Sequence, residues 1–414
     1  MTTGVRRGWL MAGFLLVVLG LCLMLFQQAR AEDSGGDHRI LVFLRMPPAH
    51  FTPQGSYGGN YGAGAEGAKR EAFARERARA NGLTVVDRWA MPMVGLDCFV
   101  MEVPADRSAK DAADTLSHDP GVEWAEPMQT YHGQGKVEDK AGGDPLAATQ
   151  PDMREWHLDA LHRIATGRNV KVAVIDSAVD ARHPDLAGQV TVRQNFVSGR
   201  PDAPEIHGTG VAGIIAAAAD NGQGIIGVAP NARLMALRAC WQESPAATVC
   251  DTLSLAKALY FAVEHRADII NMSLSGPSDR ILGNLIDAAQ SRGITVVGAV
   301  DPAQGDGGFP ASHAGVVAVI DEGDRSGDTR AFGAPGRDIP TTRPGGWSFV
   351  NGSSYAAAHV SGLFALIRER SNKPQSAAAL VTTGTDNIID PCATLKRLSA
   401  QGGCAADLAA GGRP

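Results

Sequence analysis

Short, almost uninterrupted apolar runs that alternate with helical stretches limit the fold of this chain more than any other feature. The apolar runs cover residues 170–176, 233–237, 268–272, 294–297 and 316–320. Helical sequence lies between or after them, at residues 209–220, 253–265, 280–292 and 354–370. Continuous apolar strands are typical of parallel sheets buried on both faces. Their alternation with helices predicts an α/β domain with a mainly parallel central sheet, in which ligands bind at the carboxyl ends of the strands.

A smaller pattern of elements precedes this domain. Residues 38–44, 83–89, 96–103 and 122–127 are predicted strands, and residues 66–81 and 108–117 are predicted helices. The order β-α-β-β-α-β is typical of a small α+β sandwich of the ferredoxin-like type. We therefore expect a small domain at residues 38–132, a polar linker at 133–150 and the α/β domain at 151–414. A glycine-rich stretch at 55–67 is predicted to be a loop.

The first 31 residues have the pattern of an export signal. Arg6 and Arg7 precede an apolar run from Trp9 to Phe26, and Ala29-Arg30-Ala31 is a small-x-small cleavage pattern. The run is barely long enough to span a bilayer, so a retained N-terminal anchor is the alternative. Under either interpretation we expect an exported protein, periplasmic or secreted, that contacts a membrane only if this segment is retained.

Charge and cysteine content narrow the expected partners. The 38 Lys and Arg residues do not exceed the 44 Asp and Glu residues, so no basic surplus indicates a nucleic-acid partner. Export permits disulfides, and two cysteine pairs are close in sequence: Cys240 with Cys250, and Cys392 with Cys404. We predict two bridges, with buried free thiols as the alternative. The spacing is not that of a zinc site.

Three residues supply an acid, a base and a nucleophile in that order. Asp176 ends the first apolar run, His207 precedes Gly208-Thr209-Gly210, and Ser354 begins the last helix. Each residue alone is also typical of a turn or a helix cap. A serine becomes nucleophilic when an imidazole accepts its proton and a carboxylate orients that imidazole. The neighbouring Ser353 is expected to face away.

The segments around these residues resemble those of subtilisin-like serine proteases, the subtilases. They include Val174-Ile175-Asp176, His207-Gly208-Thr209-Gly210, Val228-Ala229-Pro230 and Gly352-Ser353-Ser354. The resemblance implies a three-layer subtilisin-like fold and a serine endopeptidase that acts on peptides or proteins. Ser354 would be the nucleophile and would supply one backbone oxyanion donor, His207 would be the base and then the acid, and Asp176 would orient His207.

The resemblance extends to substrate binding and to the small domain. Ser273-Leu274-Ser275 resembles the strand that pairs with an extended substrate, although ordinary core packing explains such a segment equally well. Residues 39–131 resemble the inhibitory propeptide of the family. This implies a zymogen whose own propeptide occupies the cleft and is cut off near the linker.

Asp301 departs from the family pattern. It stands where the family usually has an Asn that donates to the oxyanion, and an ionised carboxylate cannot donate. Three interpretations are open: a protonated Asp301, a substitute donor such as Gln304 or a backbone N–H, or a slow enzyme tuned to one substrate. No dense Asp/Asn loop is assigned to calcium, so no cofactor or metal site is predicted.

Two other functions are compatible with the sequence. A catalytically weak or inactive subtilase scaffold would bind a peptide or a protein, which Asp301 favours and the intact Asp176, His207 and Ser354 disfavour. A membrane-tethered maturation protease with one partner substrate would require the N-terminal segment to be retained.

Overall fold

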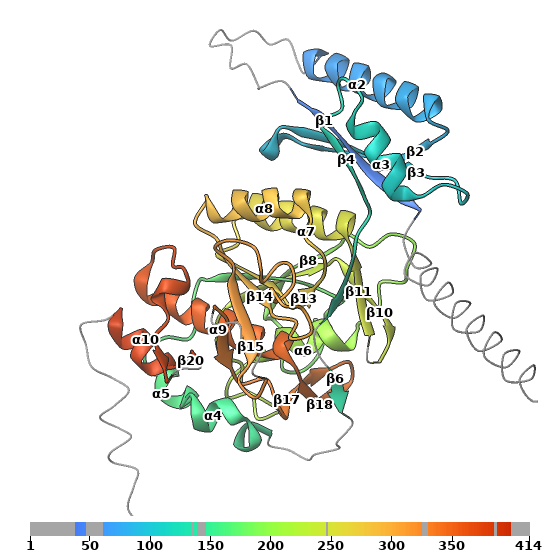
Figure 1. The fold of residues 1–414 in the computed structure, drawn as a ribbon. Coiled ribbons are helices and arrows are strands. Elements are labelled where there is room, and N and C mark those ends of the chain that lie inside the picture. The colour runs from blue at the N-terminus through green and yellow to red at the C-terminus, as the bar shows by residue number, and fades with distance from the viewer. Residues whose placement is uncertain are drawn as a thin grey trace, which may run out of the picture. The chain divides into compact units, whose positions relative to one another are not determined.

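The computed structural model describes residues 38–46, 61–133, 136–138, 146–245, 247–324, 330–384 and 387–398 (Figure 1). These residues form two units, each described below by itself. The first ends at Met128, and the second runs from Gln129 onward and also includes Met91–Val94. The predicted signal or anchor at residues 1–31 lies outside the described residues.

The first unit is a small α+β sandwich. Its elements are β1 (Arg39–Arg45), α2 (Tyr61–Ala80), β2 (Thr84–Met91), β3 (Leu96–Glu102), α3 (Ala109–Ser117) and β4 (Trp124–Pro127). The sheet order is β2-β3-β1-β4, and β1 is antiparallel to both β3 and β4. This confirms the β-α-β-β-α-β prediction. Helix α2 begins at Tyr61 rather than at residue 66, so the predicted loop at 55–67 is wrong from residue 61 onward. The glycines in these first turns lower helix propensity, which is why the sequence did not indicate a helix there.

The second unit is built on a mainly parallel sheet. Its strands are β7 (Lys171–Asp176), β8 (Val190–Asn195), β9 (Arg233–Arg238), β12 (Ile269–Met272), β14 (Thr295–Ala299), β15 (Val317–Asp321), β16 (Phe332–Ala334), β19 (Thr382–Thr383) and β20 (Ile388–Ile389). In the part of the chain that the structure describes, their order is β19-β20-β16-β15-β14-β12-β7-β9-β8. Every neighbouring pair is parallel except β19 and β20. The predicted α/β class is therefore confirmed.

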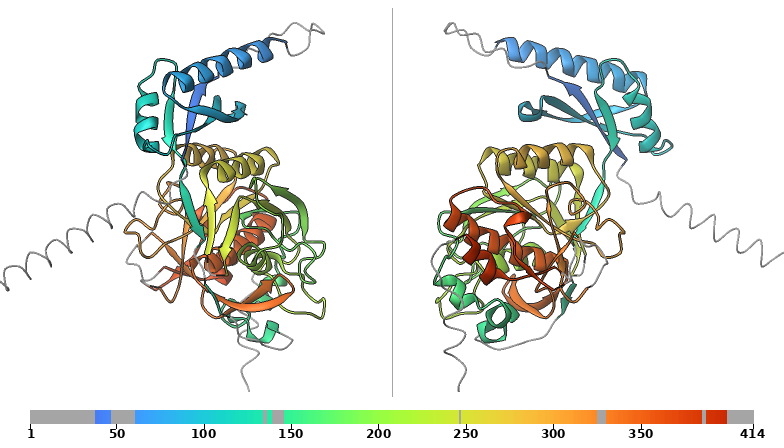
Figure 2. Two further views of the ribbon diagram at one scale, coloured as in Figure 1. Left: turned by 90° about the vertical axis from the view of Figure 1, so that its right-hand side faces the viewer. Right: turned by 60° about the vertical axis from the view of Figure 1, so that its left-hand side comes forward.

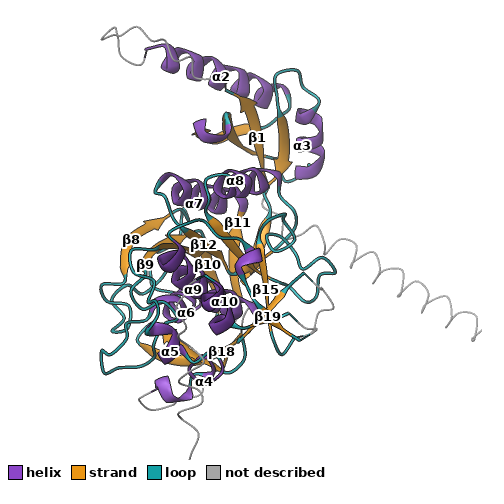
Figure 3. Ribbon diagram, turned by 90° about the vertical axis from the view of Figure 1, so that its left-hand side faces the viewer, coloured by secondary structure: helices purple, strands orange, loops and turns teal. Residues whose placement is uncertain are grey.

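Helices cover both faces of this sheet, which gives three layers (Figure 3). They are α4 (Pro151–Glu155), α5 (Leu158–His162), α6 (Ile206–Ala216), α7 (Thr252–Glu264), α8 (Arg280–Gln290), α9 (Ser353–Ser371) and α10 (Pro391–Arg397). Helix α6 is buried from His207 to Ala216 and α9 from Ser353 to Ile367, as expected of stretches in which small and apolar residues occupy every face. Gly213 lets α6 lie tightly against a neighbouring strand, because a Cβ there would be 2.3 Å from Thr342 Oγ1.

Two smaller antiparallel sheets flank the central one. The first contains β10 (Cys240–Ser244), β11 (Ala247–Asp251), β5 (Thr130–Gly133) and β13 (Leu274–Ser275), in that order. Figure 2 shows β5 beside the hairpin of β10 and β11. The second contains β17 (Ile339–Arg343), β18 (Gly346–Asn351) and β6 (Lys136–Glu138). The described parts of the predicted linker thus include a paired strand, β6, and a 3₁₀ turn at Leu146–Thr149.

One of the two predicted disulfides is present. Cys240 and Cys250 face each other across β10 and β11 and form a bond. The prediction for Cys392 is wrong: this residue lies on α10 as a free thiol and packs against the core as a small apolar side chain. Its predicted partner, Cys404, lies outside the described residues. Cys98 is a buried residue of β3.

Candidate active site

Asp176 and His207 form a buried hydrogen-bonded pair. Asp176 ends β7, and His207 is the second residue of α6. The distance from His207 Nδ1 to Asp176 Oδ1 is 2.8 Å, and the Ser177 N–H also donates to Asp176 Oδ1. The buried Nε2 atom of His207 has no hydrogen-bond partner among the described residues. The imidazole is therefore oriented on one side and available to accept a proton on the other.

A buried ion pair fixes the start of α6 and hence the position of His207. Glu205 is the N-cap residue of α6, and its carboxylate accepts hydrogen bonds from Arg238 Nη2 at 3.0 Å and from the Ala178 N–H at 2.7 Å. Arg238 is only 4% exposed. Sequence reasoning missed this pair, because nothing local to either residue indicates the contact.

Ser354 lies in the first turn of α9 and binds Ser273, the residue between β12 and β13, rather than His207. Its Oγ donates to the Ser273 carbonyl at 2.9 Å, while Ser273 Oγ donates to the Ser354 carbonyl at 2.7 Å. Ser354 is fully buried. No hydrogen bond joins Ser354 Oγ and His207 Nε2 in the described residues, and catalytic hydrogen bonds often form only in the complex with substrate.

Tyr355 packs beside the Asp176–His207 pair. The ring centroids of Tyr355 and His207 are 5.5 Å apart, and Tyr355 is fully buried. Burial, assisted by the Asp176 charge, raises the pKa of the Tyr355 hydroxyl far above its usual range. Burial therefore favours the neutral phenol, which adds no charge to the site.

Asp301 lies after β14 and binds its own loop. Its Oδ1 accepts from the Ala303 N–H at 2.9 Å, and its Oδ2 accepts from Gln304 Nε2 at 3.1 Å. Gln304 Nε2 also donates to Ser275 Oγ at 3.1 Å. The Asp301 N–H donates to the Gly307 carbonyl. Neither the Gln304 amide nor this backbone N–H is thus left over to act as a substitute oxyanion donor.

The predicted substrate strand pairs with a segment of the same chain. Strand β5 lies between β11 and β13, with Gly133 opposite Leu274 and His132 opposite Ser275. A Cβ added at Gly133 would be 3.3 Å from His207 Nε2. Downstream, Lys136 in β6 pairs with Asn351, three residues before Ser354. The chain therefore enters the site beside His207 and leaves it beside the start of α9.

Of the predicted substrate-binding residues, Leu274 and Ser275 pair with β5, and Ser273 binds Ser354 instead. The opposite wall, β11, was not predicted. The only sequence signal for it was the close pair Cys240 and Cys250, because a short disulfide-closed loop is compatible with a hairpin.

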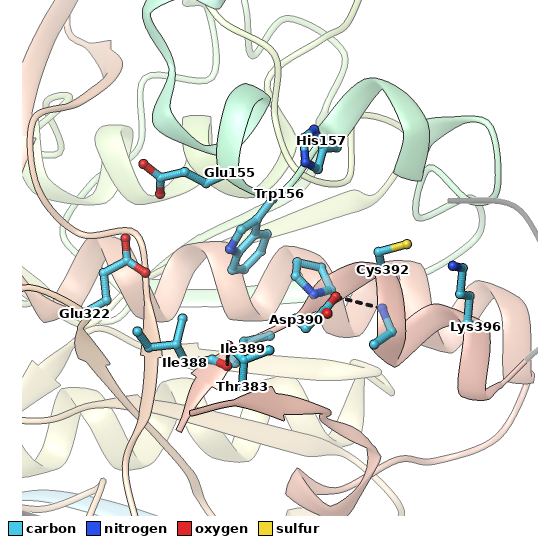
Figure 4. A pocket seen from close by; sticks show the side chains of 12 residues that line it. Glu155, Trp156, His157, Glu322, Thr383, Ile388, Ile389, Asp390, Cys392 and Lys396 are labelled. Carbon is cyan, nitrogen blue, oxygen red and sulfur yellow. Dashed lines mark hydrogen bonds between the residues drawn. The ribbon is translucent and has the colours of Figure 1, made fainter. Parts of the chain in front are cut away.

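A separate cavity of about 620 Å³ lies near α10 and contains none of these residues (Figure 4). Trp156, Ile388 and Pro391 give it an apolar wall, and Glu155 and Glu322 place two carboxyls at one end. Burial, followed by the Glu155 charge, raises the pKa of Glu322 to about 7. In the described part of the chain, no group of three or more His, Cys, Asp or Glu side chains is arranged to hold a metal ion.

The raised pKa of Glu322 predicts a pH-dependent stability. The folded chain holds a proton on Glu322 that the unfolded chain releases near its ordinary pKa of 4.5. The contribution of this carboxyl to stability is therefore present below pH 4.5 and lost as the pH rises through about 7. Relative to wild type, Glu322→Gln is expected to gain about 1–2 kcal/mol between about pH 5 and about pH 8, a value reduced by solvent screening of this half-buried group. Urea unfolding at several pH values measures the free energy of unfolding of both proteins. A difference between them that does not change with pH would contradict the prediction.

Comparisons with known proteins agree on one family. The model of the subtilase family matches residues 167–398. A thermophilic serine proteinase of Bacillus sp. strain AK1 is 34% identical over 265 residues, which cover 61% of this chain and 64% of that protein. Subtilisin E of Bacillus subtilis strain 168 is 34% identical over 280 residues, covering 62% and 68% respectively. The chain thus spans just under two thirds of the first relative and about two thirds of the second.

Solved structures show the same fold. Fervidolysin from Fervidobacterium pennivorans, a keratinolytic enzyme related to subtilisin, superposes with a TM-score of 0.67 at 21% identity. The superposition covers 89% of this chain and 62% of the fervidolysin chain. A protease from Pseudoalteromonas arctica gives a TM-score of 0.55 at 24% identity, covering 63% and 100%. Among the described residues, no helix is long and apolar enough to cross a bilayer.

Proposed function

Because the chain belongs to the subtilase family, we propose that it is a serine endopeptidase that uses Ser354, His207 and Asp176. The proposal is supported by the buried His207–Asp176 hydrogen bond, by the free Nε2 of His207 and by the position of Ser354 at the start of α9. These are the groups that peptide-bond hydrolysis through an acyl-enzyme requires, in the chain order of the subtilases.

In the proposed mechanism, Ser354 Oγ attacks the carbonyl carbon of the scissile bond while its proton passes to His207 Nε2. Asp176 holds the imidazole through Nδ1 and stabilises the imidazolium that forms. His207 then gives the proton to the leaving amine, which departs with the C-terminal part of the substrate. A water molecule, deprotonated by His207, hydrolyses the ester and regenerates Ser354.

The observation that carries the proposal is the passage of the chain's own segment through the site. Strand β5 is paired on both sides like an extended substrate, and β6 continues beyond Ser354. We propose that the precursor is cut between Gly133 and Lys136. The upstream segment, including the small α+β unit that ends at Met128, then acts as an inhibitory propeptide.

The oxyanion site is expected to be weakened by Asp301. Loss of one donor lowers turnover by about 100- to 1000-fold, a magnitude measured in a subtilisin. Because the Gln304 amide is already shared between Asp301 and Ser275, we favour a slow or specialised protease over one with a substitute side-chain donor.

Export is part of the proposal. The signal pattern at residues 1–31 and the Cys240–Cys250 bond both fit an oxidising compartment, periplasmic or extracellular. The relatives include a minor extracellular protease of Bacillus subtilis and an intracellular serine protease of Paenibacillus polymyxa.

The second candidate function is that of a non-catalytic scaffold that binds peptides between β11 and β13. The carboxylate of Asp301 favours this candidate, because it cannot donate a hydrogen bond to an oxyanion.

One experiment separates the two candidates. The full chain is expressed, treated with a fluorophosphonate probe, and analysed by mass and N-terminal sequence. A protease is expected to be labelled at Ser354 and to yield a new N-terminus between Gln134 and Lys136. Recovery of an unlabelled chain with residues 38–133 still attached would exclude the protease and leave the binding scaffold.

A further inference from the structure

The helix that carries His207 is capped by side chains from two other segments of the chain. The first N–H groups of a helix have no partner within the helix, and the N-cap side chain of α6 makes no capping hydrogen bond. Instead, the Ile206 N–H donates to Gln242 Oε1 at 3.0 Å. The Gly208 N–H donates to Ser177 Oγ, also at 3.0 Å. The residues on both sides of His207 are therefore held from outside α6.

The two capping residues belong to different parts of the site. Ser177 directly follows Asp176, so its hydrogen bond ties α6 to the acid of the proposed triad. Gln242 lies in β10, one strand of the hairpin of β10 and β11. Its backbone N–H also donates to Glu205 Oε1 at 3.0 Å. Gln242 thus joins the hairpin to the start of α6 through its backbone and through its side chain.

At this point the hairpin and His207 are separated by the width of one residue. Gln242 pairs with Thr248 in β11. A Cβ added at Gly133 in β5 would be 3.1 Å from Thr248 Cβ and 3.3 Å from His207 Nε2, so Gly133 lies between these two side chains. A disulfide joins β10 to β11. A side chain that holds β10 to α6 therefore also sets the distance between β11 and the imidazole.

We propose that Gln242 is a positioning residue that keeps His207 in register with a substrate bound along β11. This inference rests on the proposed protease function. Proton transfer requires the imidazole and the scissile bond to meet in one geometry, and a misplacement of about 1 Å can lower a rate by about 100-fold. The hydrogen bond from the Ile206 N–H fixes that geometry from the hairpin side, and Asp176 fixes the imidazole from the other side.

The test compares two substrates in Gln242→Met, which keeps the length of the side chain but replaces its carbonyl with a weak thioether acceptor. An internally quenched peptide that copies residues 129–138 lies along the hairpin, whereas p-nitrophenyl acetate is too small to reach it. For the peptide, kcat is expected to fall by about 10- to 100-fold. Its KM is expected to change little, because β11 still pairs through its backbone. Hydrolysis of the ester is expected to stay near the wild-type rate, because Asp176 and Ser177 still hold His207 and α6.

Glu243→Gln is the matched control in the same strand. Glu243 follows Gln242, is exposed, and accepts a hydrogen bond from Trp241 Nε1 at 3.4 Å. Both rates are expected to stay near the wild-type values in this variant. All rates are normalised to the fraction of the protein that a fluorophosphonate probe labels, and thermal unfolding checks that each variant is folded. If Gln242→Met does not fold, Gln242→Asn replaces it, and the same split is expected because this side chain is one methylene too short.

The outcomes distinguish this inference from the function on which it rests. An unchanged kcat on the peptide in Gln242→Met overturns the role of Gln242. An equal fall on the peptide and on the ester also overturns it, because a purely structural cap of α6 would slow both reactions together. If the wild-type protein hydrolyses neither substrate and is not labelled by fluorophosphonate, the protease proposal itself fails, and this inference fails with it.

Discussion

Ser354→Ala is expected to accumulate as an uncut precursor and to lose turnover by about a million-fold, the loss measured for the nucleophile of a subtilisin. The loss should be in kcat rather than in KM, because β11 and β13, which pair with β5 and are the proposed substrate-binding strands, do so through their backbones and not through this hydroxyl. Gel mobility of the expressed chain measures self-processing, and a quenched peptide copying residues 129–138 measures turnover after the precursor is cut by an added protease.

Ser353→Ala is the matched control for this variant. Ser353 is also buried and also lies in the first turn of α9, but no role in the chemistry is assigned to it. It is expected to mature and to hydrolyse the peptide within a few-fold of wild type. Normal self-processing by Ser354→Ala would show that another group, or a contaminating protease, makes the cut.

Asp301→Asn is expected to raise turnover by at least ten-fold, and by about 100- to 1000-fold if the new amide donates fully to the oxyanion. The substitution also changes one contact in the loop. Asp301 Oδ2 accepts from Gln304 Nε2 at 3.1 Å, and an asparagine N–H in that place would face another donor. The asparagine side chain is therefore expected to rotate away from Gln304, which keeps its hydrogen bond to Ser275. The measurement is kcat on the same quenched peptide.

Asp306→Asn controls for the loss of one negative charge in the same loop. Asp306 is exposed and its carboxylate accepts from the Gly308 N–H, so its replacement is expected to leave kcat near the wild-type value. A rate for Asp301→Asn that is unchanged or lower than wild type would reject Asp301 as a defective donor.

The elements that could be predicted from the sequence were those set by local patterns. The apolar run that ends at Asp176 is β7, and the small-residue helix after His207 is α6. Parallel strands buried on both faces give an unambiguous apolar signal, so the order of the central domain followed from it. The hydrogen bond between His207 and Asp176 joins two segments that each carried their own motif.

The contacts that the sequence did not predict join residues far apart in the chain. Residues 133–150 have no periodicity. Nothing in the local sequence therefore showed that β5, which ends at Gly133, pairs with β13, or that β6 at Lys136–Glu138 pairs with β18. The Tyr131 ring packs beside Gly276 and the Phe309 ring, which lie far downstream in the chain.

The central position of β5 in its sheet has a consequence for any protein that this site meets. A segment that enters between β11 and β13 must offer free backbone groups on both edges at once. In a helix, or in a strand already paired in its own sheet, those backbone groups are already hydrogen-bonded, so the segment must first unfold locally. We therefore expect this sheet to bind segments whose backbone is unpaired, such as loop tips, chain ends and unfolded chains. A neighbour in the same compartment that exposes no such loop or chain end would not be bound, whatever its sequence.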